Sequence, residues 1–235
     1  MIKAILFDLD GTLLPMDIDE FAEAYIGGLV RCAVGAGFDK DRVKDGILKG
    51  IYAMVKNDGS ATNEQVFFRA LAEEAGEEIY ERQSIFDGFY MTDFQKIKDI
   101  CGTLAEAGEI IELVKGRGLR AVLATNPLFP AVATESRIRW AGLSPEDFEL
   151  FTSYESSHYC KPNPDYYREV LDRLALSPDE CVMVGNDAEE DMIAGTLGIK
   201  TFLLTNNLIN RKGVDINRYN HGGTKELIKF LRELV

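Results

Sequence analysis

Residues 4–12 read Ala-Ile-Leu-Phe-Asp-Leu-Asp-Gly-Thr, a short apolar run that ends abruptly in charge. Such a run is typical of a buried strand in a parallel sheet, which delivers polar side chains at its carboxyl end. Asp8 and Asp10 are two positions apart, so they share one face of an extended chain, and Gly11 permits a sharp turn after them. Because two close carboxylates repel each other, the pair favours a bound cation or a proton on one of them. The pair therefore indicates a functional site more than a simple turn.

Short apolar runs of the same kind recur later in the chain, and helical patterns separate them. We expect strands at residues 119–124, 149–151, 181–184 and 200–204. Strands that alternate with helices predict a parallel sheet with helices on both faces. The predicted fold class is therefore α/β, with a Rossmann-like, doubly wound core whose ligands bind at the carboxyl ends of the strands.

A long helical stretch, residues 15–91, interrupts this alternation. Asp17 and Glu20 have capping-box spacing at the start of a periodic apolar pattern, and two more helical patterns follow. The stretch is far longer than the usual βα loop of about two to six residues. We expect it to form an all-α cap domain over the ligand-binding edge of the sheet. Residues 1–14 and 92–235 would then form the core domain.

The composition excludes several classes of protein. Of the 235 residues, 46% are hydrophobic and 28% charged, as in ordinary globular domains. A formal net charge of −13 argues against nucleic acid or an anionic membrane as the main partner. No run approaches the roughly 18 apolar residues of a membrane span. Four separated cysteines without a CxxC motif indicate neither a disulfide framework nor a zinc site, which favours a reducing, cytoplasmic location. The oligomeric state stays open.

Polar residues also follow the later strands. Thr125 and Asn126 offer hydroxyl, amide and backbone N–H groups that could bind anionic oxygens near the start of the next helix. Lys161 supplies a positive charge. Asp187 and Asp191 are expected on one face at the N-terminus of a helix over residues 187–197, where two carboxylates suit Mg²⁺. Taken alone, these residues fit a turn, a surface lysine and a helix cap equally well.

The order of these residues is more specific than any of them alone. It resembles the four motifs of the haloacid dehalogenase superfamily, which occur here in the same order and span essentially the whole predicted core. The corresponding stretches are Asp8-Leu-Asp10-Gly-Thr12, Thr125-Asn126, Lys161-Pro162 and Gly185-Asn186-Asp187-x-x-x-Asp191. The helical insertion between the first two motifs resembles the small helical cap of that family. One departure is that Asn186 intervenes where the fourth motif usually reads Gly-Asp.

The resemblance implies catalytic roles for three residues. Asp8 would attack phosphorus and form an aspartyl-phosphate intermediate. Asp10 would protonate the leaving oxygen and then deprotonate the attacking water. Lys161 would hold a fixed positive charge beside the nucleophile. Dehalogenases of the family lack the second aspartate, so Asp10 favours phosphoryl transfer.

The resemblance also implies how substrate and metal would be bound. Thr125 would bind phosphoryl oxygens, and Thr12 and Asn126 are further substrate-binding candidates. Mg²⁺ would be held by Asp8, the backbone carbonyl of Asp10 and Asp187. Asp191 would be a metal ligand or would orient Lys161. The inserted Asn186 leaves open which carboxylate of this loop, Glu190 included, contacts the metal.

The expected function is that of a Mg²⁺-dependent phosphatase acting on a small phosphorylated metabolite. A phosphomutase of the same superfamily is an alternative, because it would use the same phosphoenzyme and protect it from water. A non-enzymatic phosphate-binding or signalling protein is a second alternative, although such a protein would be expected to have lost one of the four motifs. Substrate choice is expected to depend on the helical insertion, where Tyr25, Arg31, Tyr52 and Lys56 are candidates to face the site.

Overall fold

The computed structural model describes residues 1–234, which contain a parallel six-stranded sheet in the order β3-β2-β1-β4-β5-β6. The strands are β1 (Ala4–Phe7), β2 (Arg120–Leu123), β3 (Leu150–Phe151), β4 (Cys181–Gly185), β5 (Lys200–Leu204) and β6 (Asn220–Gly222). The predicted α/β fold is confirmed, and five strands lie where the apolar runs placed them. β6 was not predicted, because an Asn-His-Gly edge strand has no apolar run to reveal it.

The first strand occupies the centre of the sheet. Phe7 at its end pairs with Leu123 of β2 and Val184 of β4. The three chains therefore leave the sheet at the same level, which brings together Asp8 and the residues that follow β2 and β4. Both faces of β1 are buried, so its side chains belong alternately to two hydrophobic clusters.

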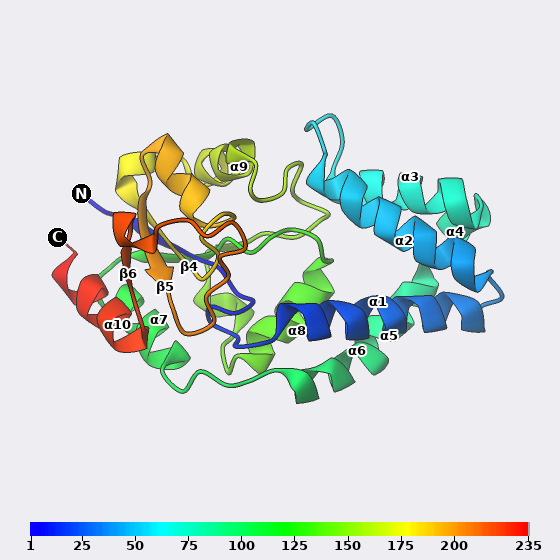
Figure 1. Cartoon of the computed structure of the whole chain (residues 1–235), viewed down its shortest axis with the longest axis horizontal. Helices are drawn as coiled ribbons and strands as arrows, with labels where there is room; N and C mark the ends of the chain where they lie inside the picture. Colours follow the sequence, from blue (N-terminus) through cyan, green and yellow to red (C-terminus); the bar gives the residue numbers. More distant parts are fainter. Residues whose placement is uncertain (235) are drawn as a thin grey trace.

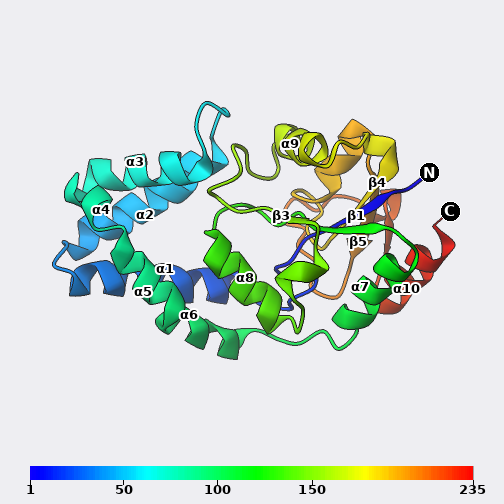
Figure 2. The same cartoon turned by 180° about the vertical axis from the view of Figure 1, so that it is seen from behind.

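Helices cover both faces of the sheet (Figures 1 and 2). The core helices are α7 (Ala107–Gly116), α8 (Ala131–Trp140), α9 (Pro164–Leu174) and α10 (Thr224–Glu233), with short 3₁₀ turns η2 (Pro145–Asp147), η3 (Pro178–Glu180), η4 (Met192–Leu197) and η5 (Ile216–Arg218). Side chains of α7 and α10 pack with Ile5 and Phe7 on one face, and those of α9 and η4 pack with Ala4 and Leu6 on the other. Within residues 1–234, no helix has the length and apolar character that crossing a bilayer requires.

The helix expected over residues 187–197 is not formed as predicted. Residues 187–191 form a hydrogen-bonded turn, and only Met192–Leu197 is helical, as the 3₁₀ turn η4. The Asp187 side chain accepts the backbone N–H groups of Glu189 and Glu190, and Asp191 Oδ2 accepts the N–H of Asp187. The Asp187 side chain thus acts as a helix N-cap does, and the Asp191 N–H reaches the Asp187 carbonyl at 3.1 Å, but the chain then continues as a 3₁₀ turn.

A helical lobe, residues 18–100, separates β1 from β2 and lies to one side of the sheet (Figure 1). Its elements are α1 (Ile18–Gly35), α2 (Lys40–Val55), α3 (Asn63–Ala75), α4 (Glu78–Glu81), α5 (Ser84–Met91), α6 (Asp93–Lys96) and the 3₁₀ turn η1 (Ile97–Ile100). α1 begins where Asp17 accepts the N–H groups of Asp19 and Glu20 at 3.0 Å. The helical run therefore continues past residue 91, the end expected for the insertion.

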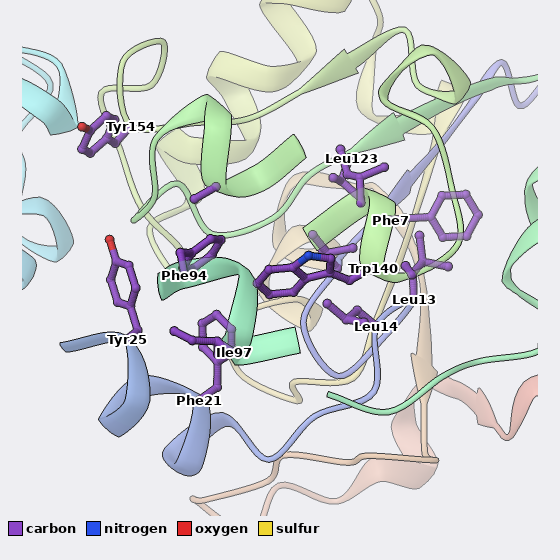
Figure 3. Packing of buried hydrophobic residues seen from close by; sticks show 14 of the residues in the cluster. Phe7, Leu13, Leu14, Phe21, Tyr25, Phe94, Ile97, Leu123, Trp140 and Tyr154 are labelled. Carbon is purple, nitrogen blue, oxygen red and sulfur yellow. The ribbon is translucent and has the colours of Figure 1, made fainter. Parts of the chain in front are cut away.

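Aromatic side chains join the lobe to the core (Figure 3). The Tyr25 and Phe21 rings lie 4.8 and 5.9 Å from that of Phe129, which precedes α8. Phe94 of α6 lies 4.9 Å from Trp140 of α8. Because these rings belong to one continuous hydrophobic cluster, the lobe is packed onto the core rather than tethered to it.

A pair of buried phenols in this cluster makes stability sensitive to alkaline pH. The hydroxyls of Tyr25 and Tyr90 lie 2.8 Å apart, and burial raises the pKa of Tyr25 to about 12. Above pH 10 the unfolded chain loses a proton that folded Tyr25 retains, so stability falls as pH rises to about 12. We expect a loss of about 2–3 kcal/mol from this group, measured by urea denaturation at pH 9 and pH 11.5. Tyr25→Phe should reduce the loss and Tyr52→Phe, at an exposed position, should not; an equal response of both variants would contradict the assignment.

Candidate functional site

A cavity of about 480 Å³ lies at the carboxyl edge of the sheet, beside the first residue of α1. It is lined by Asp8, Asp10, Ile18, Thr125, Asn126, Leu128, Phe129, Pro162, Asn186, Asp187, Glu189, Glu190, Asp191, Ile209, Arg211 and Lys212. The structure thus brings together the ends of β1, β2 and β4 and the loop before α9, as the sequence predicted. Two further predicted residues, Thr12 and Lys161, lie behind this surface and contact Asp8.

Asp8 is held from both sides. Lys161 Nζ lies 2.9 Å from Oδ1, and Thr12 Oγ1 lies 3.2 Å from Oδ2. Thr12 Oγ1 is also 3.0 Å from Asn186 Oδ1, and its single proton serves one of these acceptors at a time. These contacts fix the Asp8 carboxylate while its position at the cavity wall leaves it reachable.

Lys161 is a buried cation between two carboxylates. Its side chain is 1% exposed, and Nζ lies 2.6 Å from Asp191 Oδ1 in addition to Asp8. Burial alone would lower the pKa of Lys161, but Asp191 and Asp8 reverse that effect and raise it well above its usual range. Burial raises the pKa of Asp191, and the attraction of Lys161 offsets part of that increase. Lys161 therefore carries a permanent positive charge next to Asp8.

Glycines allow the loops of the site to approach each other. Gly11 has φ +86°, and a Cβ there would collide with the side chain of Asn186. A Cβ at Gly185 would collide with the carboxylate of Asp191. Gly11 is needed because the loops after β1 and β4 are in direct contact, and Gly185 because the turn after β4 folds back onto the end of that strand.

Asn126 connects two of the loops. Its Nδ2 donates to Glu190 Oε2 at 2.9 Å, and its Oδ1 accepts the backbone N–H of Lys161 at 3.2 Å. Burial raises the pKa of Glu190 to about 7. Thr125 is buried at the cavity wall, and its carbonyl accepts the hydroxyl of Tyr166 at 2.8 Å. Asn126 thus holds the loop of Lys161, and Thr125 is tied to α9.

Arg137 is a residue of the site that the sequence analysis missed. It lies on α8, is fully buried, and forms an ion pair with Asp10 Oδ2. Burial raises the pKa of Asp10, and Arg137 opposes that increase. The available signal was helical periodicity, since Arg137 is four residues after Ala133 and three before Trp140, both buried. An arginine on the buried face of a predicted helix calls for a buried anion.

The candidates from the helical insertion do not line the cavity. Tyr25 is buried among aromatic rings, and Tyr52 is 65% exposed. Neither these nor Arg31 and Lys56 are among the lining residues. The lobe instead contributes Ile18.

The positive charge at the mouth of the cavity comes from the core. Arg211 and Lys212 lie in the loop between β5 and η5 and form ion pairs with Asp19 and Glu189. No motif marked these residues in the sequence.

The carboxylates at the cavity fit a magnesium ion that would complete its coordination with water and substrate phosphate. Within residues 1–234, no three His, Cys, Asp or Glu side chains lie close enough to form a complete metal cage. Mg²⁺ is usually bound by one or two carboxylates together with waters and substrate phosphate, so a complete cage is not needed. Asp8 and Asp187 line the same cavity, and the second oxygen of Asp187 accepts no hydrogen bond from the described residues. Both oxygens of Asp191 are already engaged, by Lys161 and by a backbone N–H.

Comparison of the sequence with known proteins finds phosphatases along its whole length. A glyceraldehyde 3-phosphate phosphatase of Methanopyrus kandleri is 26% identical over 244 aligned residues, which cover 100% of this chain and 99% of that protein. A phosphoglycolate phosphatase of Vibrio vulnificus is 26% identical over 94% of this chain and 86% of that protein.

The fold is shared with both phosphatases and dehalogenases. A HAD phosphatase from Thermococcus onnurineus superimposes with a TM-score of 0.59 at 20% identity over 98% of both chains. An L-2-haloacid dehalogenase from Xanthobacter autotrophicus gives a TM-score of 0.52 at 18% identity over 98% of this chain and 88% of its own. The family model of the haloacid dehalogenase-like hydrolases matches residues 2–198. The chain therefore belongs to the haloacid dehalogenase-like hydrolase family and is an enzyme of its phosphatase-like branch.

Proposed function

We propose that the chain is a Mg²⁺-dependent phosphatase that hydrolyses a small phosphorylated metabolite through an aspartyl-phosphate on Asp8. The observation that carries this proposal is the pairing of Asp8 with the buried Lys161 at the wall of a cavity that also holds Asp10. The volume of this cavity, about 480 Å³, lies in the lower part of the usual range for ligand pockets and suits a small molecule. The similar proteins named for glyceraldehyde 3-phosphate and phosphoglycolate agree with a substrate of that size.

The proposed reaction gives each of these side chains one role. An oxygen of Asp8 attacks phosphorus as the bond to the leaving oxygen breaks, and Asp10 gives that oxygen its proton. Asp10 then takes a proton from the water that hydrolyses the aspartyl-phosphate. Lys161 offsets the negative charge of nucleophile and phosphoryl group throughout, because its own two carboxylate contacts keep it charged and fixed.

The magnesium ion would be held by Asp8, the carbonyl of Asp10 and Asp187. When bound, it would neutralise negative charge on the phosphoryl group. We assign Asp191 to orienting Lys161, because its side chain is 2% exposed and its Oδ1 lies 2.6 Å from Lys161 Nζ. Thr125, Asn126 and Thr12 remain the candidates for binding or positioning the phosphoryl group.

We further propose that residues 15–91, which include most of the helical lobe, act as the cap of this active site. Ile18, the first residue of α1, lies at the cavity. The division into a cap of residues 15–91 and a core of residues 1–14 and 92–235 stays our proposal. The helical connection that follows, α6 and η1, packs between the two parts through Phe94. A cytoplasmic location also stays a proposal, based on four free thiols.

The direct test is hydrolysis of p-nitrophenyl phosphate and of an alkyl phosphate by the purified protein with Mg²⁺ and with EDTA. We expect multiple turnovers in Mg²⁺ and loss of nearly all activity in EDTA, restored by excess Mg²⁺, because uncompensated carboxylates repel the phosphate ester. Turnover without any bisphosphate activator would distinguish the phosphatase from a phosphomutase. Undiminished activity in EDTA would contradict the metal requirement, and absence of turnover with every phosphate ester would contradict the phosphatase.

A further inference from the structure

We propose that Arg137 is a positioning residue that fixes the carboxyl group of the acid–base Asp10 at the wall of the cavity. This inference rests on the proposed phosphatase function and names a residue that the four motifs do not contain.

The guanidinium of Arg137 is fixed by contacts other than Asp10. Nη2 donates to Thr134 Oγ1 at 3.2 Å, and Nε lies 3.4 Å from the carbonyl oxygen of Ala133. The face of the Phe129 ring lies 4.0 Å from Cζ. Nη1 is left to donate to Asp10 Oδ2. A planar group held at three points defines the direction of the fourth contact, which a lysine could not do.

Burying this ion pair costs free energy of desolvation, so its presence calls for an explanation. Arg137 is 0% exposed, and removing a charged group from water costs several kcal/mol that a single ion pair only partly offsets. A hydrophobic residue of similar size would pack the α8 position at lower cost. Arg137 contacts one carboxylate, and that carboxylate lines the catalytic cavity two residues after Asp8. The contact therefore points to Asp10 rather than to general stability.

The contact with Arg137 orients the whole Asp10 carboxyl group. A guanidinium only donates hydrogen bonds, so Asp10 Oδ2 serves as its acceptor. Asp10 Oδ1 is buried and has no hydrogen-bond partner within residues 1–234, so Arg137 is the side chain that sets the direction of this group. In the proposed reaction the Asp10 carboxyl group gives a proton to the ester oxygen as the P–O bond breaks, and takes one from the attacking water.

The test compares leaving groups in Arg137→Met. We expect kcat for an alkyl phosphate to fall by about 10²-fold, within the range for losing acid–base catalysis, with KM little changed. For p-nitrophenyl phosphate the fall should be much smaller, since its leaving group needs little protonation. Asp10→Asn should show the same difference between the two substrates. Adding Arg137→Met to Asp10→Asn should cause little further loss of kcat, because both changes remove the same function.

Arg139→Met is the matched control. Arg139 lies on the same helix, and its ion pair with Glu135 is exposed to solvent, so we expect wild-type kinetics for both substrates. If Arg137→Met does not fold, Arg137→Lys is measured instead, and the same split between leaving groups is expected because a lysine does not reproduce the planar contact. Equal losses for both substrates, or full additivity with Asp10→Asn, would overturn the inference and leave the phosphatase assignment intact. A wild-type protein without phosphatase activity would overturn both.

Discussion

Asp8→Asn is expected to lower the hydrolysis of every phosphate ester by on the order of 10⁴-fold or more, the range seen when a covalent nucleophile is removed. The amide is isosteric but cannot form an acyl-phosphate. Unlike the loss in Asp10→Asn, this loss should not depend on the leaving group, because bond formation to phosphorus is prevented in each case. The measurement is kcat for p-nitrophenyl phosphate and for an alkyl phosphate at saturating Mg²⁺.

The fold should survive this substitution. Lys161 keeps its contact with Asp191 at 2.6 Å, and an amide oxygen can still accept from Nζ at the position of Asp8 Oδ1. The control Asp172→Asn makes the same chemical change at an exposed position of α9 and should retain wild-type activity. Acid quenching during turnover should trap a hydroxylamine-labile phosphoenzyme in wild type and none in Asp8→Asn. Near-wild-type turnover in Asp8→Asn would show that Asp8 is not the nucleophile.

The parts of the fold predicted from sequence are those that local patterns encode. Short runs of three to six residues revealed the buried strands, and polar residues that follow these runs revealed the carboxyl edge. The prediction failed where tertiary or side-chain contacts decide. β6 is held by backbone pairing to β5. Where an α-helix was expected over residues 187–197, Asn186 and Ala188 bond to the backbone of Ile209, a tertiary contact that no local pattern encodes.

The candidate site was predictable to the same degree as the fold, because short local motifs encode part of it. Asp8, Asp10 and Asp191 belong to short motifs that follow β1 and β4, so their meeting follows from the sheet. Lys161 lies in the loop before α9, where the Lys-Pro motif indicated it. Arg137 is 127 positions from its partner Asp10, on a helix without a motif, and only the packing of α8 brings the two together.

The lining residues beyond the motifs were not predictable. Arg211 and Lys212 lie in a loop without periodicity, so no local pattern places them at the cavity. The four candidates from the lobe were chosen by residue type alone, and their burial and position depend on how the lobe packs.

Lys161→Met is expected to destabilise the protein by about 3–5 kcal/mol as well as to abolish activity, because it leaves two buried carboxylates facing each other without a cation. Urea denaturation at pH 7 in EDTA measures the loss without stabilisation by metal. The exposed pair of Lys115 and Asp147 provides the control, and Lys115→Met should cost at most about 1 kcal/mol. Adding Asp191→Asn to Lys161→Met should restore part of the stability, since it removes one uncompensated charge, so the two changes should be strongly non-additive. If the free energy of unfolding falls no further in Lys161→Met than in Lys115→Met, the buried lysine does not hold the carboxylates of the site together.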